Sequence, residues 1–287
     1  MTFEQLRIFV AVAEREHLTQ AAFALRLTPS AVSSAIKSLE TFYGIHLFDR
    51  VGRGIQLTRE GKLFLQEAKG TLAKVKSTEA LLAELGNLKT GSLDIQASQT
   101  IANYWLPQRL LAFSQAYPGI AINVAIGNTA SVAAAVVAGD VEFGFIEGFL
   151  DEPALALSPV GTDKLVIVAS ASQKLAAPCE LTSLRWIMRE PGSGTRSVFE
   201  RALRDMGIDP SRLDVALVLP SNEALLTAVM SGSCVTALSE SIVKPFIENG
   251  QLQIVDLDLP PRRFTLLRHK ERHLTAPARK FEPYCHT

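Results

Sequence analysis

Residues 18–58 read LTQAAFALRLTPSAVSSAIKSLETFYGIHLFDRVGRGIQLT, and this segment contains signals for two short helices followed by a small hairpin. Thr19 can cap a first helix, and Thr28 followed by Pro29 supplies an N-cap and a proline at the first position of a second helix. Two short helices joined by a tight turn, the second presenting its N-terminal face, form a helix-turn-helix. The segment therefore predicts a helix-turn-helix with a hairpin attached to it.

The helix that begins at Pro29 has one apolar and one polar face. Its apolar positions recur at helical spacing and predict a buried stripe of Val32, Ile36, Leu39 and Tyr43. The cap and the exposed face of the first turns comprise Thr28, Pro29, Ser30, Ser33, Ser34 and Lys37. Such small polar side chains suit contact with base edges in the major groove of DNA. In an ordinary three-helix unit the same face would only be solvated.

A helix before this segment and the hairpin within it complete a winged helix-turn-helix. Residues 3–13 carry apolar side chains at helical spacing, which predicts an amphipathic helix. Residues 44–58 alternate apolar and polar positions around a glycine-rich turn, which predicts two short strands. Arg50 and Arg53 lie on this wing, where guanidinium groups can contact the phosphates of double-stranded DNA.

One long helix is predicted from Thr58 to about Leu88, because this segment lacks proline and is rich in Leu, Ala, Lys and Glu. Its apolar side chains follow a three- and four-residue spacing, at Leu65, Ala68, Leu72, Val75 and Leu82. A second copy of the chain would cover this stripe; packing on the C-terminal domain of the same chain is the alternative. A two-fold dimer would read a pseudo-palindromic DNA site with two recognition helices.

Strand and helix patterns alternate in two sets after Gly91, the first ending near residue 146 and the second beginning near residue 165. We expect two α/β lobes with largely parallel sheets, the first over about 91–161 and the second beginning at about 162. The predicted fold class is α+β multidomain: a winged helix-turn-helix DNA-binding domain (1–60), a linker and dimerisation helix (61–90), and a two-lobed α/β effector-binding domain (91–287).

Polar side chains follow strands or precede helices of this C-terminal region, which are the places where two-lobed domains bind ligands. The candidates are Ser98, Thr100, Glu147, Ser193, Thr195, Ser221 and Asn222. Helix N-termini attract negative charge, so a small anion is the expected effector. The hydroxyl and amide groups could instead serve only as helix caps. Glu147 could be protonated, pair with Arg196, or receive an amine or hydroxyl of a ligand.

Composition excludes several classes of protein. The formal net charge is zero, with 12 Lys and Arg against 9 Asp and Glu in residues 1–90 and 17 against 20 in residues 91–287. The N-terminus lacks the pattern of a signal peptide, and no apolar run is long enough to span a membrane, so we expect a cytoplasmic protein. Three widely spaced cysteines give no disulfide framework or metal site. No catalytic constellation or cofactor motif is visible, so we predict no enzyme activity, cofactor or metal.

Residues 5–61 strongly resemble the LysR-type transcriptional regulators, through AA at 21–22, SAVS at 30–33, LFDR at 47–50 and LT at 57–58. Weaker similarity covers nearly the whole chain and implies a periplasmic-binding-protein-like fold for the two lobes. In that fold the end of the chain returns to the first lobe, so the resemblance implies a lobe one of about 91–161 and 264–287 and a lobe two of about 162–263. The run EPGSGTR at 190–196, SNEA at 221–224 and the pair Ser98 and Thr100 resemble the branch that regulates cysteine and sulfur metabolism. That branch suggests a small oxyanion or carboxylate as effector.

The resemblance implies a homodimer, pairing further into a homotetramer, that binds promoter DNA, with RNA polymerase as a further partner. It places Ser30, Ser33 and Lys37 in the DNA interface and Arg50 and Arg53 on the DNA backbone. Pro29 stands where the family commonly has glutamine, and Ser34 where it has a longer polar side chain, so some usual contacts are missing. The alternative is a solute-binding module that acts through a protein partner, which leaves residues 1–60 without a role.

Overall fold

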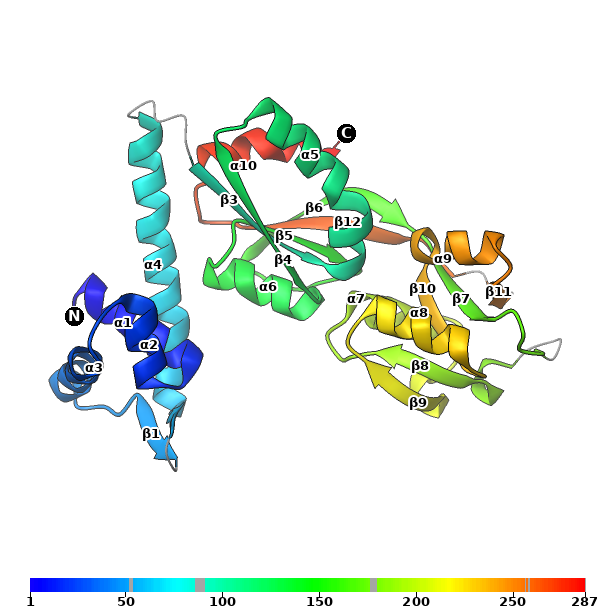
Figure 1. Ribbon diagram of the computed structural model, residues 1–287, viewed down its shortest axis with the longest axis horizontal. Coiled ribbons are helices and arrows are strands. Elements are labelled where there is room, and N and C mark those ends of the chain that lie inside the picture. Colours follow the sequence, from blue (N-terminus) through cyan, green and yellow to red (C-terminus); the bar gives the residue numbers. More distant parts are fainter. Residues whose placement is uncertain (52–53, 86–90, 176–179, 256, 258, 287) are drawn as a thin grey trace. The chain divides into compact units, whose positions relative to one another are not determined.

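The computed structural model describes residues 1–51, 54–85, 91–175, 180–255, 257 and 259–286. The chain divides into two compact units. The second unit takes in Asn87–Val137 and Val141–Thr287, and the first contains the remainder, including all of Met1–Gly86. The two units are described separately below (Figure 1).

The first unit is a three-helix bundle with a two-stranded wing and a long helix. Its elements are α1 (Phe3–Arg15), α2 (Leu18–Leu25), α3 (Pro29–Tyr43), β1 (Phe48–Val51), β2 (Gly54–Leu57) and α4 (Arg59–Leu85). Thr28 caps α3 by accepting a hydrogen bond from the backbone N–H of Ala31 at 3.2 Å, with Pro29 in the first turn. The predicted cap of α2 was wrong, because His17 rather than Thr19 occupies that position.

Phe9 of α1 lies at the centre of the first unit and is fully buried. Its ring lies 5.5 Å from that of Phe48 on the wing and 4.6 Å from that of Phe64 on α4, measured between centroids. Val32, Ile36 and Leu39 of α3 are buried in the same core. One apolar core therefore fixes the position of α3 relative to the wing and the start of α4.

Lobe one of the second unit is a five-stranded sheet with helices on both faces (Figure 1). The strands, in the order β4-β3-β5-β12-β6, are β4 (Ile120–Gly127), β3 (Gly91–Ser98), β5 (Phe143–Glu147), β12 (Arg262–His269) and β6 (Leu155–Asp163). A π-helical turn η1 (Ile101–Trp105), α5 (Leu106–Ala116) and α10 (Ala276–Phe281) pack on one face, and α6 (Thr129–Ala138) packs on the other.

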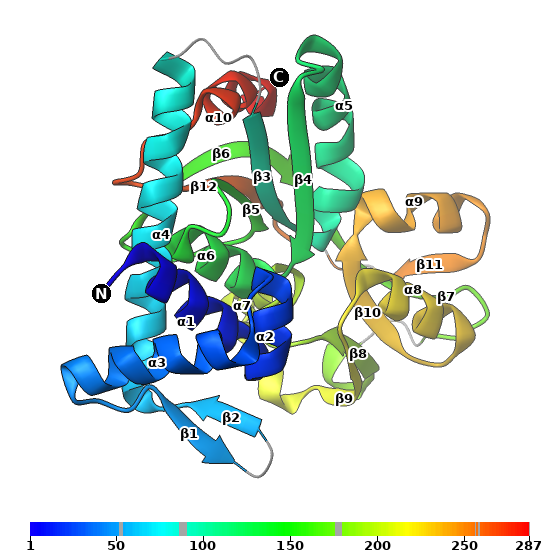
Figure 2. The same ribbon diagram turned by 60° about the vertical axis from the view of Figure 1, so that its left-hand side comes forward.

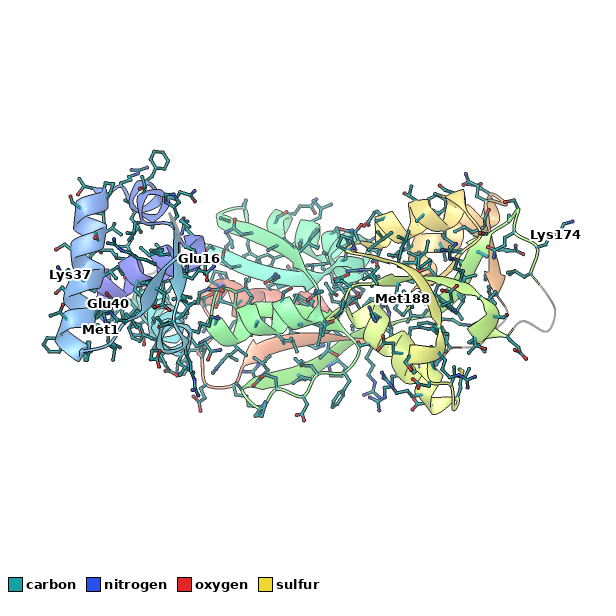
Figure 3. The ribbon with its side chains drawn as sticks, turned by 90° about the horizontal axis from the view of Figure 1, so that it is seen from below. Met1, Glu16, Lys37, Glu40, Lys174 and Met188 are labelled. Carbon is teal, nitrogen blue, oxygen red and sulfur yellow. The ribbon has the colours of Figure 1, made fainter. Side chains whose placement is uncertain are left out.

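Lobe two repeats this arrangement with the strand order β11-β7-β10-β8-β9. Its strands are β7 (Leu165–Ser170), β8 (Arg185–Arg189), β9 (Asp214–Leu219), β10 (Val235–Ser239) and β11 (Leu252–Val255). Helix α7 (Gly194–Asp205) covers one face, and α8 (Asn222–Ser231) and α9 (Glu240–Glu248) cover the other (Figure 2). Met188 of β8 lies inside this lobe (Figure 3).

The sheets are less parallel than predicted. β3 pairs in parallel with β4 and β5, whereas β12 pairs antiparallel with β5 and β6. In lobe two, β8 pairs in parallel with β9 and β10, whereas β7 pairs antiparallel with β10 and β11. In lobe one the antiparallel pairs arise because β6 carries the chain out of the lobe and β12 brings it back. Three elements, β6, β11 and α9, were not predicted.

Candidate nucleic-acid interface and ligand cleft

The N-terminal half of α3 presents the predicted polar face to solvent. Ser30, Ser33, Ser34 and Lys37 are all exposed, as are Thr28 and Pro29 at the start of the helix. Lys37 is labelled on α3 in Figure 3. The Thr28 hydroxyl lies 3.1 Å from that of Ser30, so the cap and the first exposed serine are held together. This face is free to enter a groove of DNA.

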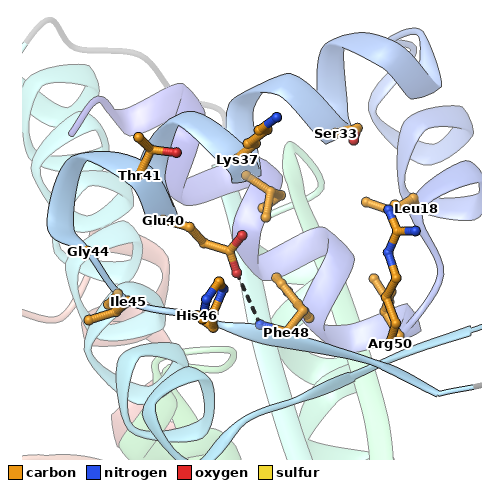
Figure 4. A pocket seen from close by; sticks show the side chains of 12 residues that line it. Leu18, Ser33, Lys37, Glu40, Thr41, Gly44, Ile45, His46, Phe48 and Arg50 are labelled. Atoms are coloured by element: carbon orange, nitrogen blue, oxygen red, sulfur yellow. Dashed lines mark hydrogen bonds between the residues drawn. The ribbon is translucent and has the colours of Figure 1, made fainter.

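A groove of about 540 Å³ separates α3 from the wing, and Lys37, His46 and Arg50 line it (Figure 4). Glu40 lies at its floor and accepts hydrogen bonds from the backbone N–H groups of Leu47, at 2.7 Å, and Phe48, at 3.3 Å. These bonds connect the recognition helix to the first strand of the wing. Sequence reasoning missed Glu40, whose partners lie seven and eight residues further along the chain.

The wing carries Arg50 on its exposed surface, on β1, where Arg50 pairs with Ile55 of β2. Arg53, the other predicted phosphate contact, lies outside the described residues. Tyr43 was wrongly predicted to be buried, since it is 50% exposed and its ring meets that of exposed Phe42 edge-on at 4.8 Å. Tyr43 is the last residue of α3, where the helix has already passed beyond the core.

The apolar stripe of α4 has a first part that packs on the core of the first unit and a second part that is more exposed. Ala68 is buried in the core of the first unit, and Leu65 and Leu72 are half-buried against that core. Val75 is half-buried, and Leu82 is 64% exposed. The first half of α4 therefore packs on the winged helix of its own chain. The sequence had suggested packing on a second copy or on the C-terminal domain instead. Val75 and Leu82 are the members of the stripe available for a second copy.

In the second unit, six of the seven predicted ligand residues are buried: Ser98, Thr100, Glu147, Ser193, Thr195 and Asn222. Ser221 is half-buried and caps α8 by accepting a hydrogen bond from the N–H of Ala224 at 3.0 Å. Ser193, in contrast, stands at the N-cap position of α7 without making a side-chain capping bond. The capping explanation therefore accounts for Ser221 and leaves Ser193 without that role.

Side chains from the two lobes meet at this cluster. The Asn222 backbone N–H donates to Gln99 Oε1 at 2.7 Å, and its side-chain amide donates to the Thr100 hydroxyl at 3.2 Å. The Asn128 amide donates to Glu190 at 3.2 Å. Gln99 and Thr100 follow β3 of lobe one, whereas Asn222 begins α8 of lobe two. The segments that sequence analysis selected in each lobe thus come together at strand and helix ends.

Arg189 is a buried cation in the cluster that sequence analysis did not select. Its guanidinium group donates to Asn222 Oδ1 at 2.6 Å, to Gln99 Oε1 at 3.1 Å and to both carboxylate oxygens of Glu190 at 2.8 and 3.0 Å. Burial of Glu190 opposes its ionisation, but the hydrogen bonds from Arg189 and Asn128 outweigh it and lower the pKa of Glu190. The lowered pKa favours the ionised form of the Glu190 carboxylate.

Arg262 forms a second buried ion pair, at the points where the chain crosses between the lobes. It donates to Asp163 Oδ2 through two nitrogens at 2.6 and 2.8 Å. The same guanidinium group donates to the hydroxyls of Thr195 at 3.0 Å and Thr100 at 3.3 Å. Because Asp163 ends β6 and Arg262 begins β12, one side chain links both crossing strands with a threonine from each lobe.

Glu147 is buried at the end of β5 and does not pair with Arg196. Arg196 instead donates to Glu200 at 2.7 Å and to the carbonyl oxygen of Arg189 at 3.0 Å. Glu147 Oε1 and the hydroxyl of Ser98 both lack a hydrogen-bond partner among the described residues. Buried polar atoms of this kind are few in native proteins and mark places where a ligand or water completes the bonding.

Two family models together cover nearly the whole chain. The model described as "Bacterial regulatory helix-turn-helix protein, lysR family" matches residues 3–62, and the LysR substrate binding domain matches residues 86–287. Within the described residues, no helix combines the length and apolarity needed to cross a membrane.

Known proteins resemble the chain over its full length. The transcriptional regulator YeiE of Escherichia coli (strain K12), itself described as uncharacterized, is 34% identical over 99% of this chain and 97% of its own. CysL of Bacillus subtilis (strain 168) is 29% identical over 90% of this chain and 87% of its own. The crystal structure of full-length CbnR with its target DNA shares the fold, with a TM-score of 0.68 and 20% identity over 99% of both chains.

The resemblance inferred from residues 5–61 is therefore confirmed over both units, and nothing in the comparisons favours a solute-binding module that works without DNA. The helix-turn-helix model matches residues of the first unit, and the substrate-binding-domain model matches the second unit. The chain belongs to the LysR family of bacterial helix-turn-helix transcriptional regulators.

Proposed function

We propose that this regulator reads promoter DNA through the N-terminal half of α3, with Ser30, Ser33 and Lys37 at the bases and Arg50 on the DNA backbone. The observation that carries the proposal is the exposed polar face of α3 beside the groove that Lys37 and Arg50 line. Glu40 supports the reading, since its bonds to the wing hold the two DNA-facing elements in one arrangement. Thr28, Pro29, Ser34 and Arg53 are the remaining proposed contacts.

The cleft between the lobes is proposed to bind a small effector without transforming it. Ser98, Thr100, Glu147, Ser193, Thr195, Ser221 and Asn222 are its proposed lining. An acidic group on the effector would suit the first turn of α7, where the Ser193 hydroxyl does not cap the helix. The regulatory domain of CcmR from Synechocystis PCC6803, 25% identical over 69% of this chain with a TM-score of 0.61, is described in complex with 2-PG. That neighbour supports the proposal that the C-terminal domain of this chain also binds a small molecule.

Effector binding would change the contact between the lobes and so the spacing of paired DNA-binding domains on a promoter. We propose that the chain works in the cytoplasm as a homodimer, assembling further into a homotetramer, and that it contacts RNA polymerase when bound to DNA.

Capture of sheared genomic DNA by the purified chain, with and without small metabolites from a cell extract, tests this function. Sharp enrichment of a few promoter fragments, altered by the metabolites, is the expected result. Recovery of DNA with no preferred fragments in either condition would contradict promoter recognition.

Replacing Val75 and Leu82 together by glutamate is expected to convert the dimer to a monomer. The two positions lie one heptad apart on α4, and opposed carboxylates in a dimer seam repel each other where apolar side chains would pack. Sedimentation equilibrium measures the change. Lys74→Glu, an exposed substitution on the same helix but off the apolar stripe, serves as the control and should leave the dimer intact. A dimer that persists in the double variant would place the seam elsewhere.

A further inference from the structure

The charges buried between the lobes do not balance. Arg189 pairs with Glu190, and Arg262 pairs with Asp163, so each cation has its own carboxylate. Glu147 is a third carboxylate, only 2% exposed, with no cation bonded to it among the described residues. An unmatched ionised group in a water-poor site is costly, and native proteins retain one where function requires it.

The backbone around Glu147 fixes where its carboxylate lies. Glu147 stands opposite Phe264 in the register of β5 and β12, and its carbonyl oxygen accepts a hydrogen bond from the Thr129 hydroxyl at 3.3 Å. The next residue, Gly148, donates its N–H to the carbonyl of Arg263 at 3.2 Å. The main chain is therefore satisfied on both sides of the side chain, and the unpartnered atom is Oε1 of the carboxylate.

The other carboxylate oxygen faces the start of α7. A methyl group added to Gly194, the first residue of α7, would lie 2.9 Å from Glu147 Oε2. The positive end of the α7 dipole therefore attracts the Glu147 charge. The dipole amounts to about half an elementary charge, so it offsets the carboxylate only in part. Oε1 remains without a donor, and the carboxylate remains without a positively charged partner among the described residues.

We propose that the effector carries a protonated amine and that Glu147 receives it. This rests on the proposed function of the cleft as the effector site. The ammonium group donates a hydrogen bond to Glu147 Oε1. It also supplies a positive charge for Glu147, because Arg189 and Arg262 are already paired with Glu190 and Asp163. An acidic group on the same molecule meets the uncapped first turn of α7, which begins beside Glu147. The substrate class is thus a small zwitterion with its amine and acid close together, as in an α-amino acid.

The first test needs no ligand. Glu147→Gln keeps the shape of the side chain and removes its charge, so it should raise the midpoint of thermal unfolding of the ligand-free chain by about 2–6 °C. Asp163→Asn is the opposite control, because it removes a matched carboxylate and leaves Arg262 without its partner; its midpoint should fall. A lower midpoint for Glu147→Gln would show that the carboxylate is already compensated and would overturn the proposal.

The second test measures thermal shifts of the full chain with the proteinogenic α-amino acids, their N-acetyl derivatives and the matching α-hydroxy acids. At least one free amino acid should raise the midpoint of the wild type, its acetylated and hydroxy counterparts should not, and Glu147→Gln should abolish the shift. Equal shifts with the acetylated or hydroxy compounds, or none with any amino acid, would overturn the proposal. DNA capture by the wild-type chain is measured in parallel, and a failure to capture DNA would count against the proposed function alone.

Discussion

A chain that carries both Ser33→Glu and Arg50→Ala is expected to bind the captured promoter fragments at least about 100-fold more weakly than the wild type. The glutamate places a negative charge on the exposed face of α3 that is proposed to enter the DNA groove, and the alanine removes a cation from the wing. Both positions are exposed, so neither change disturbs the core around Phe9. Fluorescence anisotropy at fixed salt concentration measures the affinity.

A matched variant separates this effect from a change in net charge. Thr227→Glu with Arg201→Ala makes the same two types of substitution at exposed positions of α8 and α7 in the second unit. Its DNA affinity should stay within about threefold of the wild type, because salt screens exposed charges that do not contact the DNA. Equal losses in the two double variants would mean that α3 and the wing do not form the DNA interface.

Arg262→Ala is expected to lower the free energy of unfolding of the effector domain by about 3–5 kcal/mol. The change leaves Asp163 as a buried carboxylate without its ion pair and removes the donor shared by Thr100 and Thr195. Both side chains of the pair are at most 8% exposed, so water cannot replace the lost bonds at low cost. Urea unfolding followed by tryptophan fluorescence reports on this domain, because Trp105 and Trp186 both lie in it.

Arg262→Lys tests whether geometry matters as well as charge. A lysine keeps the positive charge but cannot bridge Asp163 and both threonines, so it should recover only part of the lost stability. If Arg262→Ala lowers the free energy of unfolding by less than about 1 kcal/mol, the ion pair of Arg262 and Asp163 contributes little net stability, as is the case for some buried pairs.

Local chemistry explains how much of the first unit could be predicted. The cap of α3, with Thr28 and Pro29, depends on neighbouring residues, and the structure shows it as expected. The cap of α2 differs because His17 also offers an acceptor in the right place, and a histidine nitrogen is an uncommon cap. The packing of Leu65 and Leu72 on the core of the first unit could not be predicted, since an apolar stripe does not reveal which surface will cover it.

The missed elements of the second unit have irregular patterns. β6 contains Pro159 and Gly161, which interrupt the strand pattern, and α9 contains Pro245 within the helix. β11 is an edge strand of four residues. Proline and glycine normally argue against regular structure, and here the surrounding sheet outweighs that preference.

In the second unit, the sequence analysis selected polar side chains at strand and helix ends, and it selected neither Arg189 nor Arg262. Arg189 is the last residue of β8, so its position alone does not set it apart, and its partners Gln99 and Asn222 are 90 and 33 residues away. Arg262 meets Asp163 across 99 residues. Pairings of this length depend on how two lobes fold together, and a single sequence does not contain them in readable form.

Gly194 provides a direct way to ask whether contact between the lobes controls DNA binding. A methyl group at Gly194 would lie 2.5 Å from the Thr129 hydroxyl and 2.7 Å from the carbonyl oxygen of Glu147, both in lobe one. Such distances are too short, so Gly194→Ala must hold the lobes apart at this point. Gly232→Ala is the control, since the nearest atom to its added methyl group is 3.8 Å away.

The decisive measurement is the affinity of the wild type, Gly194→Ala and Gly232→Ala for a captured promoter fragment, with and without the metabolite fraction. We expect all three chains to bind the fragment equally without metabolites. When metabolites are added, the affinity of the wild type and of Gly232→Ala should change by several-fold, and the affinity of Gly194→Ala should not change. A change in affinity of Gly194→Ala as large as that of the wild type, or no change in the wild type, would contradict the claim that the lobes sense a small molecule and pass that signal to the DNA-binding unit.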